Sequence, residues 1–266
     1  MGIFSFRKKQ KIIGLTLSGG GMRGVAHIGT LRALDEFGLK PQVMSGSSAG
    51  AIIGAFYAAG FSPQKMQDII IKTTFFSRSS FRLGTTGIFN TGFLERLFRE
   101  YFPEDNFSAL KIPMYVAATE ITNGRTEYFS DGKLFQALLA SASIPYIFPP
   151  IRIGDKVYMD GGILNNFPIE PIYNKCDFLI GSHVNSLVYD SMQKISARKV
   201  FDRVIHLAIG NSVYSKARAC DLFFDPPNMT QYSLFDKRGI PQMLDMAYKN
   251  AAGILEKNGY KRKAQQ

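Results

Sequence analysis

The chain has few of the residues from which disulfide frameworks, zinc sites and histidine-based active sites are built. Its 266 residues include only two cysteines, Cys176 and Cys220, and three histidines. The cysteines show no CxxC spacing and the histidines do not cluster, so we expect neither a disulfide framework nor a metal site. A reducing, cytoplasmic location fits this composition. The scarcity also restricts any catalytic histidine to His27, His183 or His206.

Long hydrophobic runs and targeting segments are also missing. Residues 41–64 carry no charge, and Gly50 and Gly54 have the GxxxG spacing of membrane helix contacts. The continuously apolar part, residues 49–61, is too short to cross a bilayer, so we predict a buried helix there. At the N-terminus the charges follow the apolar residues, the reverse of a secretory signal, and Phe6 stands where myristoylation requires Ser or Thr.

Positive charge is in excess, with 32 Lys and Arg against 21 Asp and Glu. This excess favours attraction to anionic surfaces such as nucleic acid or acidic phospholipid. The charges are scattered, however, so a merely soluble basic protein is an equal alternative. Phe4 and Phe6 precede basic residues at positions 7–11, a pattern that favours peripheral contact with the inner face of a membrane. We expect no nucleic-acid partner.

A strand, loop and helix pattern occurs twice near the N-terminus. The first unit has a strand at residues 11–18, a glycine loop at 19–24 and a helix from 25 to 37 before Gly38; the second has a strand at 42–45, a turn at 46–50 and a helix at 51–59 before Gly60. Two consecutive βα units predict a parallel sheet.

The remaining pattern is less regular. We predict strands at residues 114–119, 126–129, 156–159, 178–184 and 204–209, a helix at 133–141, a fixed loop at 143–150, and helical segments between 63 and 101 to which we assign no chemistry. After Gly210 the pattern becomes irregular, and the polar end at 257–266 is expected to fray. We therefore divide the chain into a main domain at 11–210 and a C-terminal extension at 211–266, packed on the same domain and unassigned in role.

The first chemical motif is Gly46-Ser47-Ser48-Ala49-Gly50, which matches GxSxG. In this motif small residues allow a sharp strand-to-helix turn that exposes the serine hydroxyl. The predicted helix after Ser48 places the hydroxyl at a helix N-terminus, where the dipole favours negative charge. The alternative is a Gly-Ser turn that merely starts a helix.

The second motif, Gly19-Gly20-Gly21-Met22-Arg23-Gly24, formally fits GxGxxG. A dinucleotide site would need an acidic residue after the second strand, but residues 42–45 lead into the serine turn. A P-loop lacks its Gly-Lys-Ser/Thr. What remains is a loop of backbone N–H groups at a helix start, suited to hold an oxyanion. Arg23 either adds positive charge there or caps its own fold.

The third feature is the base that would activate Ser48. His27 lies in a helical run, where a packed or capping role is expected, and His183 and His206 lie in apolar strand-like stretches typical of a core. The order Ser48, Asp160, then His183 or His206 would nevertheless satisfy an α/β-hydrolase triad, so that alternative stays open.

Asp160 is the better candidate for a direct partner of Ser48. It ends a short strand and precedes Gly161 and Gly162, which let the backbone turn and leave the carboxylate exposed in a cleft. Such a Ser-Asp dyad depends on the glycine loop and the helix terminus, because a carboxylate is a weak base for serine. Taken alone, the DGG sequence would indicate an ordinary turn.

Taken in order, GGGMRG at Gly19–Gly24, GSSAG at Gly46–Gly50 and DGG at Asp160–Gly162 resemble the patatin-like phospholipase family. The similarity extends to SASIPYIFPPI and GGILNNFP and covers roughly residues 11–185. It implies a three-layer α/β/α sandwich with a mainly parallel central sheet. Ser18 stands where plant members commonly have aspartate, and the lack of long insertions resembles the compact bacterial members.

By this resemblance, Ser48 is the nucleophile and Asp160 activates first the serine and then water. The oxyanion hole consists of the amides of Gly20, Gly21 and Met22. The residues that support the motifs are Gly19, Arg23, Gly24, Gly46, Gly50, Gly161 and Gly162. The reaction would release a fatty acid from a lipid ester, as in a phospholipase A, lysophospholipase or esterase, and needs no metal or cofactor.

Two rival functions remain. An acyltransferase would pass the same acyl-enzyme to an alcohol or thiol, although a malonyl transferase would need a histidine partner and an arginine that we cannot place. A non-enzymatic lipid- or nucleic-acid-binding module would have no need for the three motifs together. Head-group preference, acyl-chain length and oligomeric state stay open.

Overall fold

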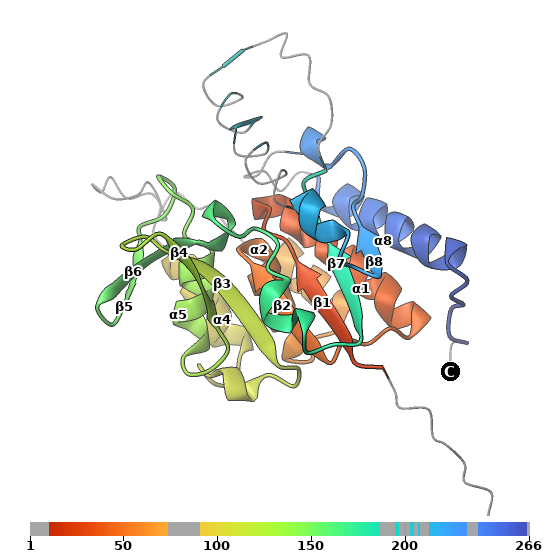
Figure 1. Ribbon diagram of the computed structural model, residues 1–266, viewed down its shortest axis with the longest axis horizontal. Coiled ribbons are helices and arrows are strands. Elements are labelled where there is room, and N and C mark those ends of the chain that lie inside the picture. The colour runs from red at the N-terminus through yellow and green to blue at the C-terminus, as the bar shows by residue number, and fades with distance from the viewer. Residues whose placement is uncertain are drawn as a thin grey trace, which may run out of the picture.

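A central mixed sheet organises the computed structural model, which describes residues 11–73, 91–186, 195–196, 200, 203–204, 207, 213–232 and 239–264. Within this part of the chain the strand order is β5-β6-β3-β2-β1-β7-β8, and β4 pairs with β3 (Figure 1). The strands are β1 (Ile13–Leu17), β2 (Val43–Ser47), β3 (Met114–Glu120), β4 (Arg125–Phe129), β5 (Ile151–Ile153), β6 (Lys156–Asp160), β7 (Phe178–Ser182) and β8 (Leu222–Phe224). The α-helices are α1 (Ala26–Phe37), α2 (Ala49–Ala58), α3 (Pro63–Lys72), α4 (Gly92–Tyr101), α5 (Leu134–Ser141), α6 (Glu170–Tyr173) and α8 (Ile240–Lys257), and the 3₁₀ helices are η1 (Gly21–Val25), η3 (Phe107–Ala109), η4 (Gly161–Ile163) and η5 (Met229–Gln231).

The sheet is parallel through its centre and antiparallel at one side. Strands β3, β2, β1, β7 and β8 run parallel to one another. Strands β4 and β6 pair antiparallel with β3, and β5 pairs antiparallel with β6. The parallel centre is the expected result of the two βα units, because a crossover helix returns the chain in the same direction.

Hydrophobic cores lie on both faces of the sheet. Leu15 and Leu17 of β1 point into the larger core with side chains of α1, α2, α4, α5 and α8. Val43 of β2 and Leu179 of β7 point into a smaller core on the opposite face, which Phe167 and Ile172 also join. Figure 1 shows helices on both sides of the strands. The predicted three-layer α/β/α sandwich is confirmed.

Both predicted βα units form. Helix α1 ends at Gly38, which adopts the left-handed conformation (φ 75°) that glycine tolerates best. The uncharged stretch at 41–64 contains α2, whose residues are mostly buried, as predicted. In the portions of the chain that can be described, no helix combines the length and apolar character needed to span a membrane.

The C-terminal part departs most from the prediction. Helix α8 packs on α1, where a Cβ added to Gly29 would lie 2.2 Å from the Leu244 carbonyl oxygen. The predicted fraying at 257–266 is wrong up to residue 264, because the chain docks back on α1 through a 2.8 Å hydrogen bond from the Lys263 N–H to the Glu36 carbonyl. The sequence analysis described this region as irregular, although the buried residues of α8 have helical spacing: Ile240, Met243, Leu244, Ala247, Ala251, Ala252 and Leu255.

The predicted buried strand at 204–209 is also wrong where it can be checked. Val204 and Leu207 are helical and are 56% and 48% exposed. His206 lies outside the described residues. Strand β8 instead extends the sheet beside β7. The division at residue 210 stays a prediction.

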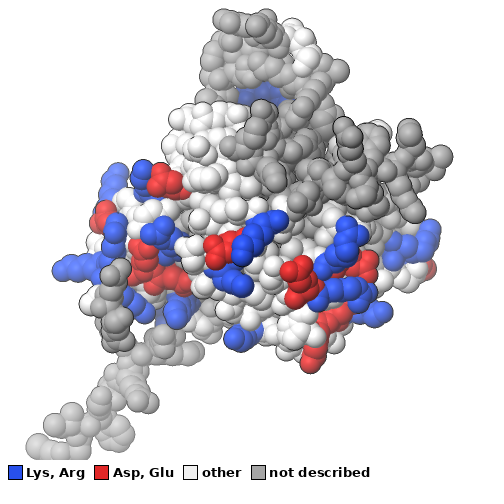
Figure 2. Space-filling view, turned by 180° about the vertical axis from the view of Figure 1, so that it is seen from behind, with Lys and Arg blue, Asp and Glu red and all other residues white. Residues whose placement is uncertain are grey.

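Charge is spread over the back of the molecule. Figure 2 shows Lys and Arg interspersed with Asp and Glu on this face, without a broad field of one sign. The mixture agrees with the scattered positive charge of the sequence, and it offers no single basic platform on this side for a polyanion.

Candidate active site

The candidate site lies where β1 and β2 end. The two strands are parallel neighbours, with Leu17 opposite Gly46. Because the carboxyl ends of parallel strands meet at one edge of a sheet, the loops that follow them lie side by side. The glycine loop at 19–24 follows β1, and Ser48 follows β2. Two motifs separated by more than twenty residues in the sequence therefore share one edge.

Ser48 occupies a strained turn between β2 and α2. Its backbone has φ 53° and ψ −125°, an unusual conformation for a residue with a side chain. A Cβ added to Gly50 would lie 2.4 Å from the Ser18 carbonyl oxygen, and one added to Gly46 would lie 2.7 Å from the Gly50 carbonyl oxygen. Both glycines are therefore required by close backbone packing, as the GxSxG motif predicts.

Asp160 reaches Ser48 from the antiparallel side of the sheet. Strand β6 runs back along β3, which places Asp160 opposite Ala118. The preceding residue of β3, Ala117, is opposite Ser47 of β2. The register of three neighbouring strands thus brings the aspartate beside the serine turn.

The Ser48 hydroxyl donates a hydrogen bond of 2.6 Å to Oδ2 of Asp160. The other carboxylate oxygen accepts one of 2.8 Å from the Gly162 N–H. Both Ser48 and Asp160 are only 6% exposed. Burial raises the pKa of Asp160 to about 6, and the hydrogen bonds from Ser48 and Gly162 oppose this rise. At neutral pH the carboxyl group is mostly ionised and is a stronger base than an exposed aspartate.

Ser141 holds the backbone of the serine turn. Its Oγ accepts a hydrogen bond of 2.8 Å from the Ser48 N–H and donates one of 2.6 Å to the Ala117 carbonyl. The side chain at the end of α5 thereby links β3 to the nucleophile turn. Sequence reasoning placed Ser141 in a segment similar to the family but gave it no role, because its use depends on how α5 meets the sheet.

The glycine loop presents the start of a helix to the site. Gly20 precedes η1, and Gly21 and Met22 are its first residues. The first N–H groups of a helix have no acceptor within it, so these amides are suited to bind an oxyanion. The Arg23 side chain is 2% exposed and donates from Nε to the Tyr232 carbonyl at 2.7 Å. Of the two predicted roles for Arg23, its position favours capping of its own fold.

Glycines bring the three motifs into close contact. A Cβ added to Gly24 would lie 2.4 Å from the Ala49 Cβ, and one added to Gly161 would lie 2.3 Å from the Ala117 carbonyl oxygen. At Gly19 it would lie 3.0 Å from the Ser48 Cβ. The motif glycines therefore serve packing between loops that are far apart in the sequence.

The histidines that the structure describes are occupied elsewhere. His27 is buried between the Ser182 hydroxyl and the Ser18 carbonyl, and burial lowers its pKa to about 4. His183 is buried with Nδ1 3.1 Å from the Asp225 carboxylate. The packed role predicted for both agrees with these contacts. The described ranges contain no group of three or more His, Cys, Asp or Glu side chains suited to a metal ion.

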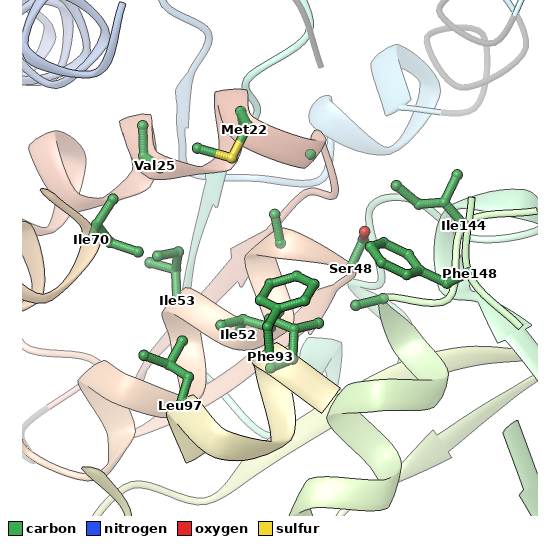
Figure 3. Close-up of a pocket in the computed structure, with 14 residues that line it drawn as sticks. Met22, Val25, Ser48, Ile52, Ile53, Ile70, Phe93, Leu97, Ile144 and Phe148 are labelled. Carbon is green, nitrogen blue, oxygen red and sulfur yellow. The ribbon is translucent and has the colours of Figure 1, made fainter. Parts of the chain in front are cut away.

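An apolar pocket opens beside Ser48 (Figure 3). Its lining consists of Gly21, Met22, Val25, Ser48, Ala49, Ile52, Ile53, Ile70, Phe93, Leu94, Leu97, Ala142, Ile144 and Phe148. In Figure 3, Ser48 lies toward Phe148 and Ile144 at one end, and Ile70 lies toward the other. Helices α3 and α4 supply part of this wall, although the sequence analysis assigned no chemistry to residues 63–101. Their apolar residues have the ordinary spacing of core-facing helices, so no sequence signal distinguished them.

A serine at a strand-to-helix turn, in contact with a buried carboxylate beside an apolar pocket, is the geometry of a serine hydrolase. The patatin-like phospholipase family model matches residues 15–173, more than half of the chain. The chain belongs to the patatin-like phospholipase family, and the resemblance read from the sequence is confirmed.

Individual relatives agree with this assignment. Lysophospholipase NTE1 of Cryptococcus neoformans is 33% identical over 175 residues, which cover 60% of this chain and 10% of the fungal protein. An uncharacterised NTE family protein of Mycobacterium tuberculosis is 31% identical over 162 residues, which cover 60% of this chain and 45% of that protein. The chain thus covers less than half the length of these relatives.

A solved structure supports the fold alone. The crystal structure of VipD from Legionella pneumophila aligns with a TM-score of 0.52 and 17% sequence identity, over 93% of this chain and 67% of VipD. The alignment includes the C-terminal region beyond residue 173, where the family model ends.

Proposed function

We propose that the protein hydrolyses lipid esters through an acyl-enzyme on Ser48, with Asp160 as its base. The observation that carries the proposal is the 2.6 Å hydrogen bond from the Ser48 hydroxyl to Asp160 at the edge of an apolar pocket. A direct contact supports a dyad over a triad, because the 2.6 Å separation leaves no room for a histidine between the two groups. His183 has its own carboxylate partner in Asp225.

In the acylation step, Ser48 Oγ attacks the ester carbonyl carbon while its proton passes to Asp160. Negative charge develops on the carbonyl oxygen, where the amides of Gly20, Gly21 and Met22 would stabilise it. The tetrahedral intermediate then collapses, the ester carbon–oxygen bond breaks, and Asp160 returns the proton to the departing alcohol. The acyl group remains as an ester of Ser48.

Deacylation repeats these steps with water. Asp160 accepts a proton from the water as its oxygen attacks the acyl carbon, and Ser48 Oγ leaves with that proton. The products are a free fatty acid and the regenerated Ser48-Asp160 pair. A base with a pKa near 6 suits both directions of proton transfer, since efficiency is greatest when the pKa lies near the working pH.

The pocket supports a fatty acyl chain as the group transferred. Its lining is almost entirely hydrocarbon, with Ser48 as its hydroxyl-bearing residue. Burial of each methylene of an acyl chain there would contribute about 0.8 kcal/mol. The lysophospholipase relatives make phospholipids and lysophospholipids the substrates to try first.

The test is labelling by a fluorophosphonate probe together with fatty acid release from a lysophospholipid. Wild type is compared with Ser48→Ala, Asp160→Asn, His183→Ala and His206→Ala. We expect loss in the Ser48 and Asp160 variants only. Equal loss in a histidine variant would establish a triad instead, and an unlabelled wild type would favour a lipid-binding module. Preferential transfer to an added alcohol over water would make the protein an acyltransferase.

We also propose peripheral contact with anionic membranes from the cytoplasmic side. The support is the sequence pattern of Phe4, Phe6 and the basic residues at 7–9 and 11, of which only Lys11 lies within the described residues. Co-sedimentation with vesicles containing acidic phospholipid, at low and high salt, tests the idea. A variant lacking the first ten residues should bind less, and equal binding would disprove the contact.

A further inference from the structure

Asn185 follows β7 and lies beyond the part of the chain that the family model matches. Its side chain is buried, with 1% exposure. The amide Nδ2 donates a hydrogen bond of 2.6 Å to the Gly19 carbonyl, and Oδ1 accepts one of 3.4 Å from Nη1 of Arg23. One side chain therefore holds both the beginning of the glycine loop and the arginine near its end.

The contact with Gly19 fixes the direction of the next amide. A trans peptide is planar, so the Gly19 carbonyl and the Gly20 N–H point in opposite directions. A donor that holds the carbonyl oxygen on one side therefore aims the Gly20 N–H to the other. The Arg23 N–H donates to the Gly20 carbonyl at 3.1 Å and in this way directs the Gly21 N–H to the opposite side.

Such control matters in this loop because glycine restrains its own backbone least. Asn166 makes a second contact with the Gly19 carbonyl, but at 3.3 Å it is longer than the bond from Asn185. The Arg23 guanidinium is in turn anchored to the Tyr232 carbonyl. Asn185 thus connects the loop to residues of the C-terminal part.

We propose that Asn185 is a positioning residue that orients the oxyanion-binding amides of the glycine loop through the Gly19 carbonyl. The assignment rests on the proposed function and adds to it a residue that no motif identifies. Asn185 acts through the backbone, and its amide is committed to Gly19 and Arg23. Its removal therefore lowers the rate of the chemical step more than it weakens substrate binding.

The experiment compares Asn185→Asp and Asn185→Leu with wild type. Aspartate keeps an acceptor for Arg23 but cannot donate to the Gly19 carbonyl, and leucine removes both bonds at similar volume. Ser186→Ala is the matched control, because Ser186 is also buried and donates only to the Pro226 carbonyl at 3.0 Å. All proteins are measured for kcat, KM and melting temperature with one lysophospholipid.

We expect kcat to fall about 10- to 100-fold in the Asn185 variants, the scale of a small misplacement of catalytic groups, with KM changed less than about twofold. Ser186→Ala should keep its kcat. A wild-type kcat in Asn185→Asp, while Ser48→Ala is inactive, would overturn the positioning role and leave the proposed function intact. An equal fall in Ser186→Ala would also overturn it. Activity that survives in Ser48→Ala would overturn the proposed function itself, and the positioning role with it.

Discussion

The two members of the Ser48-Asp160 pair are held in place by different means. Ser48 has a strained φ of 53°, which backbone packing maintains. Carbonyl oxygens lie so close to Gly46 and Gly50 that neither position has room for a side chain. Asp160 ends β6 with a negative φ of −48°, and its carboxylate is held by hydrogen bonds from Ser48 and Gly162. The backbone of the nucleophile is thus fixed mainly by close packing, whereas the carboxylate of the base is fixed by polar contacts.

This difference separates stability from activity. A strained turn of this kind costs on the order of 1–3 kcal/mol and persists only because surrounding packing enforces it. Changes on the serine side should therefore be felt first in folding. Changes on the aspartate side should be felt first in catalysis and in pH dependence.

The largest effect is expected for Gly50→Ala. The new Cβ would lie 2.4 and 2.5 Å from the carbonyl oxygens of Ser18 and Leu17, which are backbone atoms and cannot move aside cheaply. We expect a loss of more than about 4 kcal/mol in the free energy of unfolding, measured by urea denaturation. Gly253→Ala is the control, since its Cβ meets nothing within 4 Å in α8 and should stabilise by about 0.5–1 kcal/mol. Similar stability of Gly50→Ala and wild type would contradict the packing argument.

Next is Asp160→Asn, which should abolish catalysis without harming the fold. Asparagine has nearly the same shape and can still accept from the Gly162 N–H, but it cannot take the Ser48 proton. We expect kcat to fall about 10²- to 10⁴-fold, the usual contribution of a general base. Steady-state hydrolysis and a melting curve measure the two effects. If Asp160→Asn lost stability as well as activity, Asp160 would be as important for folding as the serine turn, and the contrast would be wrong.

The pH dependence of stability gives a third test. The pKa of Asp160 is raised from 3.8 to about 6 in the folded protein, so the folded state binds this proton more tightly than the unfolded state. The stabilisation is complete below pH 3.8 and is lost as the pH rises through 6, a change of about 3 kcal/mol. Wild type should lose stability relative to Asp160→Asn over this range. Urea denaturation of both proteins across the range measures the difference, and parallel curves would argue against a buried, raised pKa.

The same pKa predicts the activity profile. If ionised Asp160 is the base, kcat/KM should rise with pH and reach half its plateau near pH 6. The profile should be unchanged in His183→Ala. A midpoint that moves in that variant would assign the titration to the histidine.

The smallest effect is expected for Gly162→Ala. Its Cβ would meet side-chain atoms, Oδ1 of Asn166 at 2.7 Å and Oδ1 of Asp160 at 2.9 Å, which can shift. We expect about 1–2 kcal/mol of lost stability and a fall of about 10-fold in kcat as the carboxylate is displaced. Urea denaturation and steady-state hydrolysis of Gly162→Ala and Gly50→Ala, measured side by side, compare the aspartate side with the serine side. If Gly162→Ala lost as much stability as Gly50→Ala, the proposed difference between the two sides would be wrong.

Sequence patterns predicted the elements that are formed by short, contiguous segments. The βα units carrying the glycine loop and Ser48 follow from apolar periodicity and glycine positions, and these also indicate where β1 and β2 end. Asp160 could be proposed as the partner because the strand before it and the glycines after it form one short segment. The contact between Asp160 and Ser48, by contrast, depends on the register of β6, β3 and β2, which no single segment encodes.

Features that depend on packing between distant segments were not predicted. Ile70 and Leu97 line the pocket because α3 and α4 both border the space beside Ser48, and each has the pattern of an ordinary core residue. The roles of Ser141 and Asn185 arise from hydrogen bonds between segments that are distant in the sequence. Helix α8, in contrast, could have been predicted, because its buried residues have regular helical spacing in the sequence.

The position of β7 and β8 has a practical consequence for work on fragments. A fragment cut at the limits of the family match, residues 15–173, would lack β7, which pairs with β1, and β8, which pairs with β7. It would also lack helix α8, which packs on α1. Strand β1 would then become a bare sheet edge bordered by uncovered hydrophobic side chains, an arrangement that favours intermolecular strand pairing and precipitation. Expression of residues 15–173 alone should therefore yield aggregates, even though this fragment contains both Ser48 and Asp160.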